Sequence, residues 1–364
     1  MCQTLQYLQS HLFTIEETTI VKAGAYMPIV ATLVADQFGS HLGKYSERLK
    51  ITRKGETLQQ APLLHLEAVY ILNHGVSISA DALEACCDRG IPIHFLNPMG
   101  IPYASVYAGG LMGTVLTRRE QLRAYDDPRG AYLASRFAEG KIINMSITLK
   151  YFAKTRKDTP LGDELKLVSG EVLDHLAWLD RLDLTTVDAV RGHILAAEGN
   201  ASSRYWNAIN ALVPSTYEWK KREGRGAQDD INQLLNYGYG ILYGQVERAL
   251  VLAGLDPFGG FIHADRPGKP SLTLDLIEEF RQVSVDRVVI GLAARGFKVE
   301  RDESRLSEDT RRTFADHILG HLESNMSYEG KRRPLRQIIQ TQARRLAQYL
   351  RGENSDYLPY KVEW

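Results

Sequence analysis

The chain has little cysteine, no long apolar run and no net charge. Among its 364 residues are three cysteines, and the adjacent Cys86 and Cys87 cannot bridge distant elements, which excludes a disulfide-stabilised scaffold. No run reaches the ~18 apolar residues that a membrane helix requires, and no Cys/His spacing predicts a zinc site. Residues 1–26 lack the basic and apolar regions of a signal peptide. We therefore expect a cytoplasmic protein in a reducing compartment, without a membrane partner.

The charges balance overall but are unevenly distributed. Basic and acidic residues number 44 each, which by itself argues against a nucleic-acid-binding protein. Between Glu329 and Arg351, however, seven basic residues stand against one acid. The seven are Lys331, Arg332, Arg333, Arg336, Arg344, Arg345 and Arg351. This segment is interpreted either as a solvated helix face or as a DNA-binding track.

A change in hydrophobic period divides the chain in two. Short β-branched and aromatic runs alternate with Gly and Pro turns as far as about Leu111, and the spacing is helical from Gly113 almost to the end. The sequence predicts an α+β protein, with a β-rich dimerisation domain (29–112) before an all-α catalytic domain (113–364). Residues 1–28 form an extension of unknown role, and Met27 is an alternative start. Strands are expected at 29–34, 49–53, 68–72, 91–96 and 103–107, and helices at 79–89, 117–124, 130–156, 160–181, 185–212, 229–254, 271–295, 307–325 and 333–351.

The most informative segment is Gly260–Arg281. His263 precedes a loop broken by Pro and Gly, and the helix that follows carries Asp275 and Glu278 on one face. A histidine facing a pair of carboxylates indicates a metal site. Glu279 lies about 100° further round the helix, where an ion pair with a neighbour is the expectation.

A third acid, Glu198, lies in a run of small residues, where a helix or ligand can approach the backbone closely. Two glutamates and one histidine, Glu198, His263 and Glu278, supply the ligands that suit Mg²⁺ or Mn²⁺. Such an ion orients a hydroxyl or water and polarises a phosphate. The set therefore predicts metal-dependent phosphate chemistry.

Three segments together resemble a known family. They are Glu198-Gly-x-x-x-x-x-Tyr205-Trp206, then Asp230-Ile-Asn232-Gln-Leu-Leu-Asn-Tyr237-Gly-Tyr239-Gly-Ile-Leu-Tyr243, then Gly260-Phe-Ile-His263 followed by Ser271-Leu-x-x-Asp275-Leu-x-Glu278-x-Phe280-Arg281. Their order and spacing resemble the CRISPR-associated protein one family, the integrases and endonucleases of spacer acquisition. The resemblance covers nearly the whole chain, from about Val30 to Trp364.

The resemblance implies that Glu198, His263 and Glu278 bind Mg²⁺ or Mn²⁺ and that the enzyme inserts short DNA into a CRISPR array. It matches Asp275 to a further catalytic acid, which we expect to support the ligands or to hold a second ion. Implied partners are double-stranded and partly single-stranded DNA, a second copy of the chain in a homodimer, and CRISPR-associated protein two. Small sheets with exposed edges often associate, so we expect the β domain to form the dimer. A branched-DNA repair nuclease and a non-catalytic DNA-binding scaffold stay open as alternatives.

Groups without base preference have to hold the DNA near the ion. Arg204 and Tyr205 follow Glu198 by about two turns, and Arg266 and Lys269 lie in the loop after His263, so all four are expected to contact phosphates. The loop 219–225 is interpreted either as a single-strand contact or as a charged surface loop. Its basic residues are Lys220, Lys221, Arg222 and Arg225.

Overall fold

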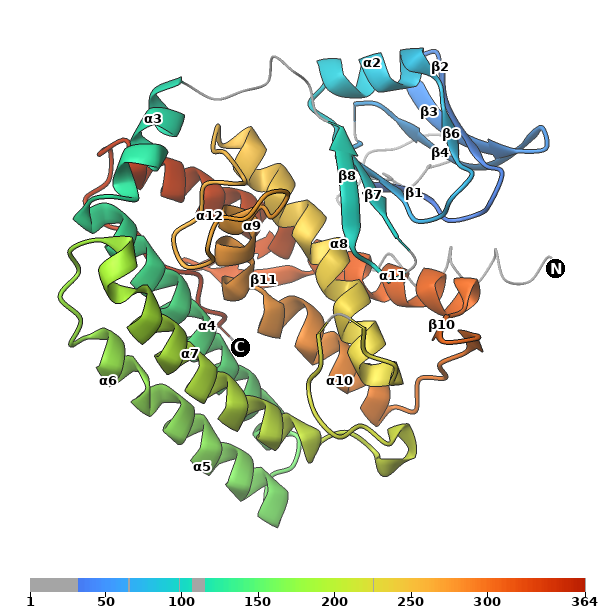
Figure 1. Cartoon of the computed structure of the whole chain (residues 1–364). Helices are drawn as coiled ribbons and strands as arrows, with labels where there is room; N and C mark the ends of the chain where they lie inside the picture. Colours follow the sequence, from blue (N-terminus) through green and yellow to red (C-terminus); the bar gives the residue numbers. More distant parts are fainter. Residues whose placement is uncertain (1–31, 65, 98, 107–114, 225, 364) are drawn as a thin grey trace.

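The structure is a computed structural model, and it describes residues 32–64, 66–97, 99–106, 115–224 and 226–363. A β-rich part lies at one end of the molecule, and helices form the larger remainder (Figure 1). The expected α+β class and the order of the two parts are therefore confirmed. The extension 1–28 and the alternative start at Met27 lie outside the described residues.

Two four-stranded sheets and one helix make up the β-rich part. The first sheet has the order β1-β5-β7-β8, in which β8 alone runs antiparallel, and the second has the order β4-β3-β2-β6. Helix α2 (Ala80–Asp88) begins at Ser79, whose side chain accepts from the Ala82 amide. The strands are β1 (Thr32–Ala35), β2 (His41–Tyr45), β3 (Arg48–Arg53), β4 (Glu56–Pro62), β5 (Ala68–Ile71), β6 (Ser77–Ile78), β7 (Ile93–Leu96) and β8 (Pro102–Val106). Most of their apolar residues form a buried cluster of their own, while Ala68, Tyr70 and Leu96 belong to the core of the helical part.

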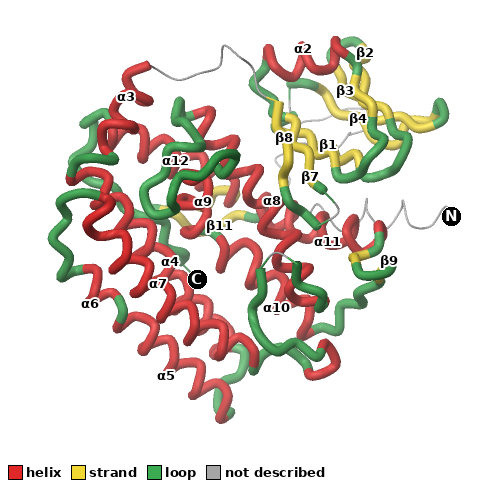
Figure 2. Tube along the Cα trace, in the orientation of Figure 1, coloured by secondary structure: helices red, strands yellow, loops and turns green. Residues whose placement is uncertain are grey.

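Long helices build the second part (Figure 2). Some of them begin where Asp and Thr side chains cap free amides: Asp127 accepts from Arg129 N, Thr159 from Gly162 N and Asp229 from Asn232 N. Helices α4, α5 and α7 pack side by side, while α8 lies between the β-rich part and α10 to α12. The helices are α3 (Val115–Ala124), α4 (Pro128–Lys154), α5 (Pro160–Asp174), α6 (Leu176–Leu179), α7 (Val187–Asn210), α8 (Asp230–Leu252), α9 (Ser271–Leu276), α10 (Arg287–Ala294), α11 (Glu308–Glu323) and α12 (Leu335–Leu350).

The expectation of an entirely helical second part was wrong in two places. Short hairpins, β9 (Arg301–Asp302) with β10 (Arg305–Leu306) and β11 (Asn325–Tyr328) with β12 (Lys331–Pro334), interrupt the helices. In the second hairpin Glu329 and Gly330 both take positive φ, 52° and 72°, the geometry of a type I′ turn. The helix expected at 271–295 is also broken, by a 3₁₀ turn η2 (Ile277–Glu279) and a π-helical segment η3 (Gln282–Asp286).

The β-rich part packs against α8 and the C-terminal helices. Ion pairs join Asp36 to Arg312 and Glu67 to Arg336. At the closest approach, a Cβ added to Gly240 would lie 1.3 Å from the carbonyl oxygen of Gly100. Only glycine therefore allows α8 to lie this close to the turn after β7.

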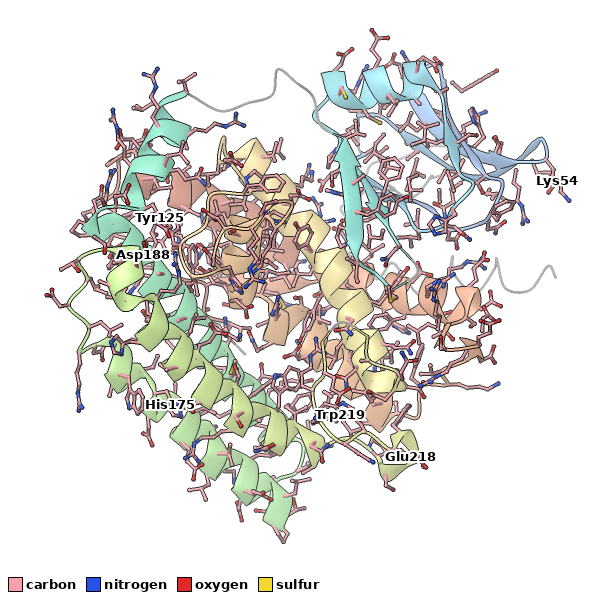
Figure 3. The ribbon with its side chains drawn as sticks, viewed as in Figure 1. Lys54, Tyr125, His175, Asp188, Glu218 and Trp219 are labelled. Carbon is pink, nitrogen blue, oxygen red and sulfur yellow. The ribbon has the colours of Figure 1, made fainter. Side chains whose placement is uncertain are left out.

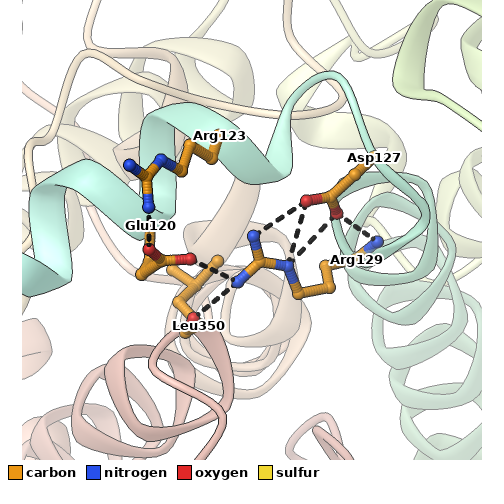
Figure 4. A network of polar contacts seen from close by, with 5 residues as sticks. All are labelled: Glu120, Arg123, Asp127, Arg129 and Leu350. Carbon is orange, nitrogen blue, oxygen red and sulfur yellow. Dashed lines mark hydrogen bonds and ion pairs between the residues drawn. The ribbon is translucent and has the colours of Figure 1, made fainter.

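The junction between α3 and α4 is fixed by a polar network (Figure 4). The Arg129 guanidinium donates to both oxygens of Asp127, to Glu120 and to the carbonyl of Leu350. This network ties α3 and the start of α4 to the end of α12. Nearby, the Tyr125 hydroxyl donates to Asp188 at the start of α7 (Figure 3).

Helix α3 also holds the segment that leads to His263. The Gln121 side chain donates to the carbonyls of Asp256 and Gly259 at 2.7 and 2.8 Å, and accepts from the Asp256 amide at 2.8 Å. Three hydrogen bonds with one buried side-chain amide hold this turn in place.

None of the helices in the described ranges is long and apolar enough to cross a membrane. Cys86 and Cys87, in α2, are both free thiols.

Candidate metal centre

Glu278 lies at the centre of a buried ion-pair cluster. It belongs to η2 and is 2% exposed. Its Oε1 lies 2.7 Å from Arg281, and its Oε2 lies 2.8 Å from Nζ of Lys141. Burial raises the pKa of Glu278, but Arg281 and Lys141 outweigh it and bring the pKa down to about 2. The carboxylate is therefore ionised at neutral pH.

Glu198 shares the Lys141 ammonium with Glu278. Glu198 lies on α7 and Lys141 on α4, and Nζ of the lysine donates to Oε1 of Glu198. The small neighbours Ala197 and Ala201 are completely buried, so they allow the two helices to approach closely. Burial lowers the pKa of Lys141, but the two carboxylates outweigh it and raise the pKa. Two glutamates 80 positions apart thus converge on one cation.

Asp275 holds His263 in a defined orientation. Its buried carboxylate accepts from the backbone amides of Phe261, Ile262 and His263 at 2.5, 3.0 and 2.9 Å. It also lies 2.8 Å from Nδ1 of the His263 ring. A carboxylate with three such donors accepts from Nδ1 as well, so Nδ1 carries the proton and Nε2 keeps its lone pair.

The three expected ligands lie in one region, but their side chains do not converge on a common position. In its protonated form, His263 lowers the pKa of Glu278, so the two side chains lie close enough to be electrostatically coupled. Among the described residues, however, no group of three or more His, Cys, Asp or Glu side chains is close enough to hold an ion together. The Lys141 ammonium lies between Glu198 and Glu278 instead.

The donor set nevertheless fits a hard divalent cation. Oε2 of Glu278 is buried, and the Lys141 ammonium lies 2.8 Å from it. The Lys141 ammonium already occupies the position between Glu198 and Glu278. Two carboxylates with one imidazole nitrogen are ligands that Mg²⁺ or Mn²⁺ accepts.

Tyr205 has a structural position, which corrects the expectation that it contacts DNA. Its side chain is completely buried, and its hydroxyl donates to Asp286 at 2.9 Å. The Tyr239 hydroxyl donates to the same carboxylate at 2.5 Å, and the Tyr239 ring lies under Arg281. Burial raises the pKa of Asp286 to about 6. Sequence reasoning missed Asp286, which η3 places next to the arginine that pairs with Glu278.

Glu279 forms no ion pair with any of the described residues, so the expectation of one is wrong for that part of the chain. Its buried carboxylate accepts from the Tyr357 hydroxyl at 2.6 Å, the Tyr360 amide at 2.8 Å and the Gln342 side chain at 3.0 Å. All three partners are neutral. Burial raises the pKa of Glu279 to about 7, although these hydrogen bonds lower it. Glu279 therefore holds the C-terminal segment around Tyr357 and Tyr360 against η2.

We expect Glu279→Gln to flatten the pH dependence of stability. Because the folded pKa is raised from 4.5 to about 7, the unfolded chain releases this proton first as pH rises. Stability is fully present below pH 4.5 and falls by about 3 kcal/mol as pH passes 7. A glutamine can satisfy the same partners, with Tyr357 accepting from its amide. Urea unfolding between pH 4.5 and 8 checks this, and equal slopes in wild type and variant would contradict it.

The exposed basic residues near His263 lie in a tight turn. Arg266 to Lys269 is closed by a hydrogen bond of 2.9 Å from the Lys269 amide to the Arg266 carbonyl. Pro267 and Gly268, with φ of +74° at the glycine, are typical of a type II turn. Arg266 is exposed and Lys269 half-buried. Arg204 is exposed on α7 and pairs with Glu171 at 2.6 Å.

In the loop after α7, two basic residues are exposed and a third is half-buried. Lys220 and Lys221 are exposed, near Trp219 and Glu218 (Figure 3). Arg222 is half-buried, donates to Asn236 and Asn232 at 2.7 and 3.1 Å, and stacks on Tyr239. Arg222 is therefore held in place by the protein, and its contact with DNA stays a prediction. The remaining expected contact, Arg225, lies outside the described residues.

Arg222 also lines a cavity of about 500 Å³ beside the ion-pair cluster. Tyr239, Arg281, Arg305 and Asn236 are among its other lining residues. Arg281 thus pairs with Glu278 on one side and faces this cavity on the other. The walls combine guanidinium groups, amides and an aromatic ring, which are the groups that contact phosphates and stack on bases.

The basic segment Lys331–Arg351 is partly neutralised within the fold. Arg336 pairs with Glu67 and Glu323, Arg345 with Glu329, and Arg351 with Glu353. Lys331, Arg332 and Arg344 are exposed. The segment is therefore less basic at the surface than its sequence predicted.

Sequence comparisons identify a protein family and relatives that this chain matches. A model of the family described as CRISPR associated protein Cas1 matches residues 33–319. The chain is 37% identical over 346 residues to the CRISPR-associated endonuclease Cas1 1 of Archaeoglobus fulgidus, covering 91% of this chain and 99% of that protein. It is 33% identical over 332 residues to the CRISPR-associated endonuclease Cas1 1 of Francisella tularensis subsp. novicida, with coverages of 91% and 99%.

Solved structures share the fold. A casposase bound to its integration product superposes with a TM-score of 0.77 at 24% identity, covering 92% of this chain and 96% of that one. A CAS1 protein from Thermotoga maritima gives 0.73 at 20% identity, with coverages of 91% and 100%. A Cas6-RT-Cas1--Cas2 complex gives 0.75 at 20% identity, covering 94% of this chain and 37% of that one.

Proposed function

Because the chain belongs to the CRISPR associated protein Cas1 family, we propose that it is a metal-dependent DNA integrase and endonuclease. It inserts short foreign DNA fragments into a CRISPR array. The observation that carries the proposal is the convergence of Glu198 and Glu278 on one buried cation, with His263 held nearby by Asp275. Relatives named as endonucleases and a casposase neighbour bound to an integration product support the same chemistry.

The reaction is a phosphodiester transesterification. The 3′-hydroxyl oxygen of the incoming fragment attacks a phosphorus of the array, the new P–O bond forms, and the bond to the array's own 3′ oxygen breaks. That oxygen takes up a proton, and the attacking hydroxyl gives one up. Glu198, His263 and Glu278 would hold Mg²⁺ or Mn²⁺, which polarises the phosphate and offsets charge on the leaving oxygen.

The residues around the centre have assigned roles in this proposal. Asp275 keeps the His263 ring oriented with Nε2 free. Arg281 supplies positive charge between Glu278 and the adjacent cavity, where the end of a DNA strand would lie. Arg204, Arg266 and Lys269 would contact phosphates alongside, and Lys220 and Lys221 would extend that path.

Assembly completes the proposal. We assign the homodimer contact to the β-rich part, which exposes large apolar side chains at Tyr45, Leu64 and Tyr103, with exposed fractions of 65%, 84% and 57%. A structural neighbour titled Cas6-RT-Cas1--Cas2 complex supports a second partner, the CRISPR-associated protein two. Double-stranded and partly single-stranded DNA is the substrate.

Product analysis tests the function against hydrolysis. Purified protein, with protein two, Mn²⁺ and a labelled fragment bearing 3′-hydroxyls, should join the fragment covalently to a plasmid that carries a repeat. Blocking the 3′ ends with dideoxynucleotides should abolish joining, since the attacking oxygen is gone. Cleavage of branched DNA with no joined product would favour the alternative repair nuclease, which uses water as nucleophile.

A salt titration tests the phosphate contacts. Loss of both cations in Arg266→Ala, Lys269→Ala should reduce the slope of log K against log salt by about 1.8 for duplex DNA, or about 0.9 per contact. The matched control is Lys54→Ala, Lys157→Ala, which removes two exposed lysines outside the turn, one of them at the tip of the β-rich part (Figure 3). Fluorescence anisotropy gives the slopes, and an unchanged slope would remove the turn from the DNA path.

A further inference from the structure

The ammonium group of Lys141 occupies a position where a metal would be expected. It contacts Glu198 and lies 2.8 Å from Oε2 of Glu278. The residue is 8% exposed, so solvent screens these contacts much less than it screens a surface ion pair. From within the fold, Lys141 therefore neutralises the buried Glu278 together with Arg281, and it also pairs with Glu198.

The oxygens involved are those that a divalent cation would use. Oε2 of Glu278 is buried, and the lysine ammonium contacts it directly. The Lys141 ammonium and a metal ion would compete for these oxygens, because two cations so close together repel each other strongly in a poorly screened interior. Glu198 and Glu278 can therefore bind one metal ion together only after Nζ has moved away.

We propose that Lys141 is a resident counter-ion that a divalent metal must displace before the two glutamates can bind it. This inference rests on the proposed function, since it concerns the same metal centre. Lys141 stabilises the metal-free protein and at the same time lowers its apparent affinity for metal, because binding occurs only in molecules whose ammonium has left. Stability without metal and affinity for metal thus oppose each other through one side chain.

Mn²⁺ binding to the full chain tests the proposal, measured by titration calorimetry without DNA. Lys141→Met keeps the length and the apolar stem of lysine but removes the charge. It should bind Mn²⁺ more tightly by about tenfold or more, as expected if the competent state is a tenth or less of wild type. The control Lys150→Met, at an exposed lysine on the same helix, should bind as wild type does. Without metal, Lys141→Met should unfold at lower urea, and Mn²⁺ should stabilise it more than wild type.

Equal or weaker Mn²⁺ binding by folded Lys141→Met would overturn the proposal. If that variant does not fold without metal, a crystal structure of wild type with Mn²⁺ decides. Nζ of Lys141 out of contact with both glutamates supports displacement, whereas Nζ still bridging them beside bound Mn²⁺ overturns it. Wild type that binds no Mn²⁺ would contradict the proposed metal chemistry itself, and the inference with it, which separates the two failures.

Discussion

Replacing Glu278 by glutamine should lower strand transfer by about a thousandfold or more and leave duplex binding nearly unchanged. Glutamine keeps the shape of the side chain but removes the charge that would hold the ion. A loss of about 4 kcal/mol of transition-state stabilisation corresponds to that factor. Duplex affinity comes mainly from phosphate contacts elsewhere. Integration of a labelled fragment into a repeat plasmid gives the rate, and gel shifts give the affinity.

The control for this variant is Glu164→Gln, at an exposed glutamate of α5. Stability has to be measured alongside, because removal of Glu278 leaves Arg281 and Lys141 short of a buried partner, a change that costs about 3–5 kcal/mol. Folded Glu278→Gln protein that integrates at the wild-type rate would refute the role of this carboxylate.

Periodicity predicted the helices better than the strands. The expected helix 79–89 and the long helices agree with the structure to within a few residues, because buried faces repeat every three or four positions. Strands β2 and β4 were missed, because they are mostly polar, with exposed side chains on much of each strand. In a small sheet with one solvated face, pairing through the backbone forms such strands without an apolar signal.

The environment of each acid was harder to predict than its presence. Asp275, Glu278 and Glu279 lie within five positions, yet one orients a histidine, one pairs with two cations and one binds neutral groups. The partners of Glu279 come from Gln342, Tyr357 and Tyr360. Helical spacing predicts which side of a helix an acid faces, but it does not predict which distant segments pack against that side.

Lys141 was not predicted, although the sequence contains a signal. It falls on the buried face of α4, four positions after Phe137 and four before Met145. A lysine in such a register is almost never buried unless it is paired, so it requires anionic partners inside the fold. The identity of those partners follows only from the packing of α4 against α7 and η2.

Asp275→Asn should weaken Mn²⁺ binding by about 10- to 100-fold and reduce strand transfer accordingly. An asparagine side chain has one acceptor oxygen, whereas Asp275 accepts from three backbone amides and from Nδ1 of His263. If its oxygen faces Phe261 and Ile262, its amide faces Nδ1, which must then accept. The proton moves to Nε2, and His263 loses the lone pair that would bind the metal.

A double-mutant cycle with His263→Ala distinguishes support of the histidine from an independent role. If Asp275 acts only by orienting His263, the double variant should bind Mn²⁺ no more weakly than His263→Ala alone, because the interaction is already lost. An Asp275 that held a second ion would add its own loss in full. Titration calorimetry of the four proteins gives the coupling, and urea unfolding corrects for the backbone bonds that the asparagine breaks. Additive losses in metal affinity would contradict the orienting role and indicate that Asp275 itself binds a metal ion.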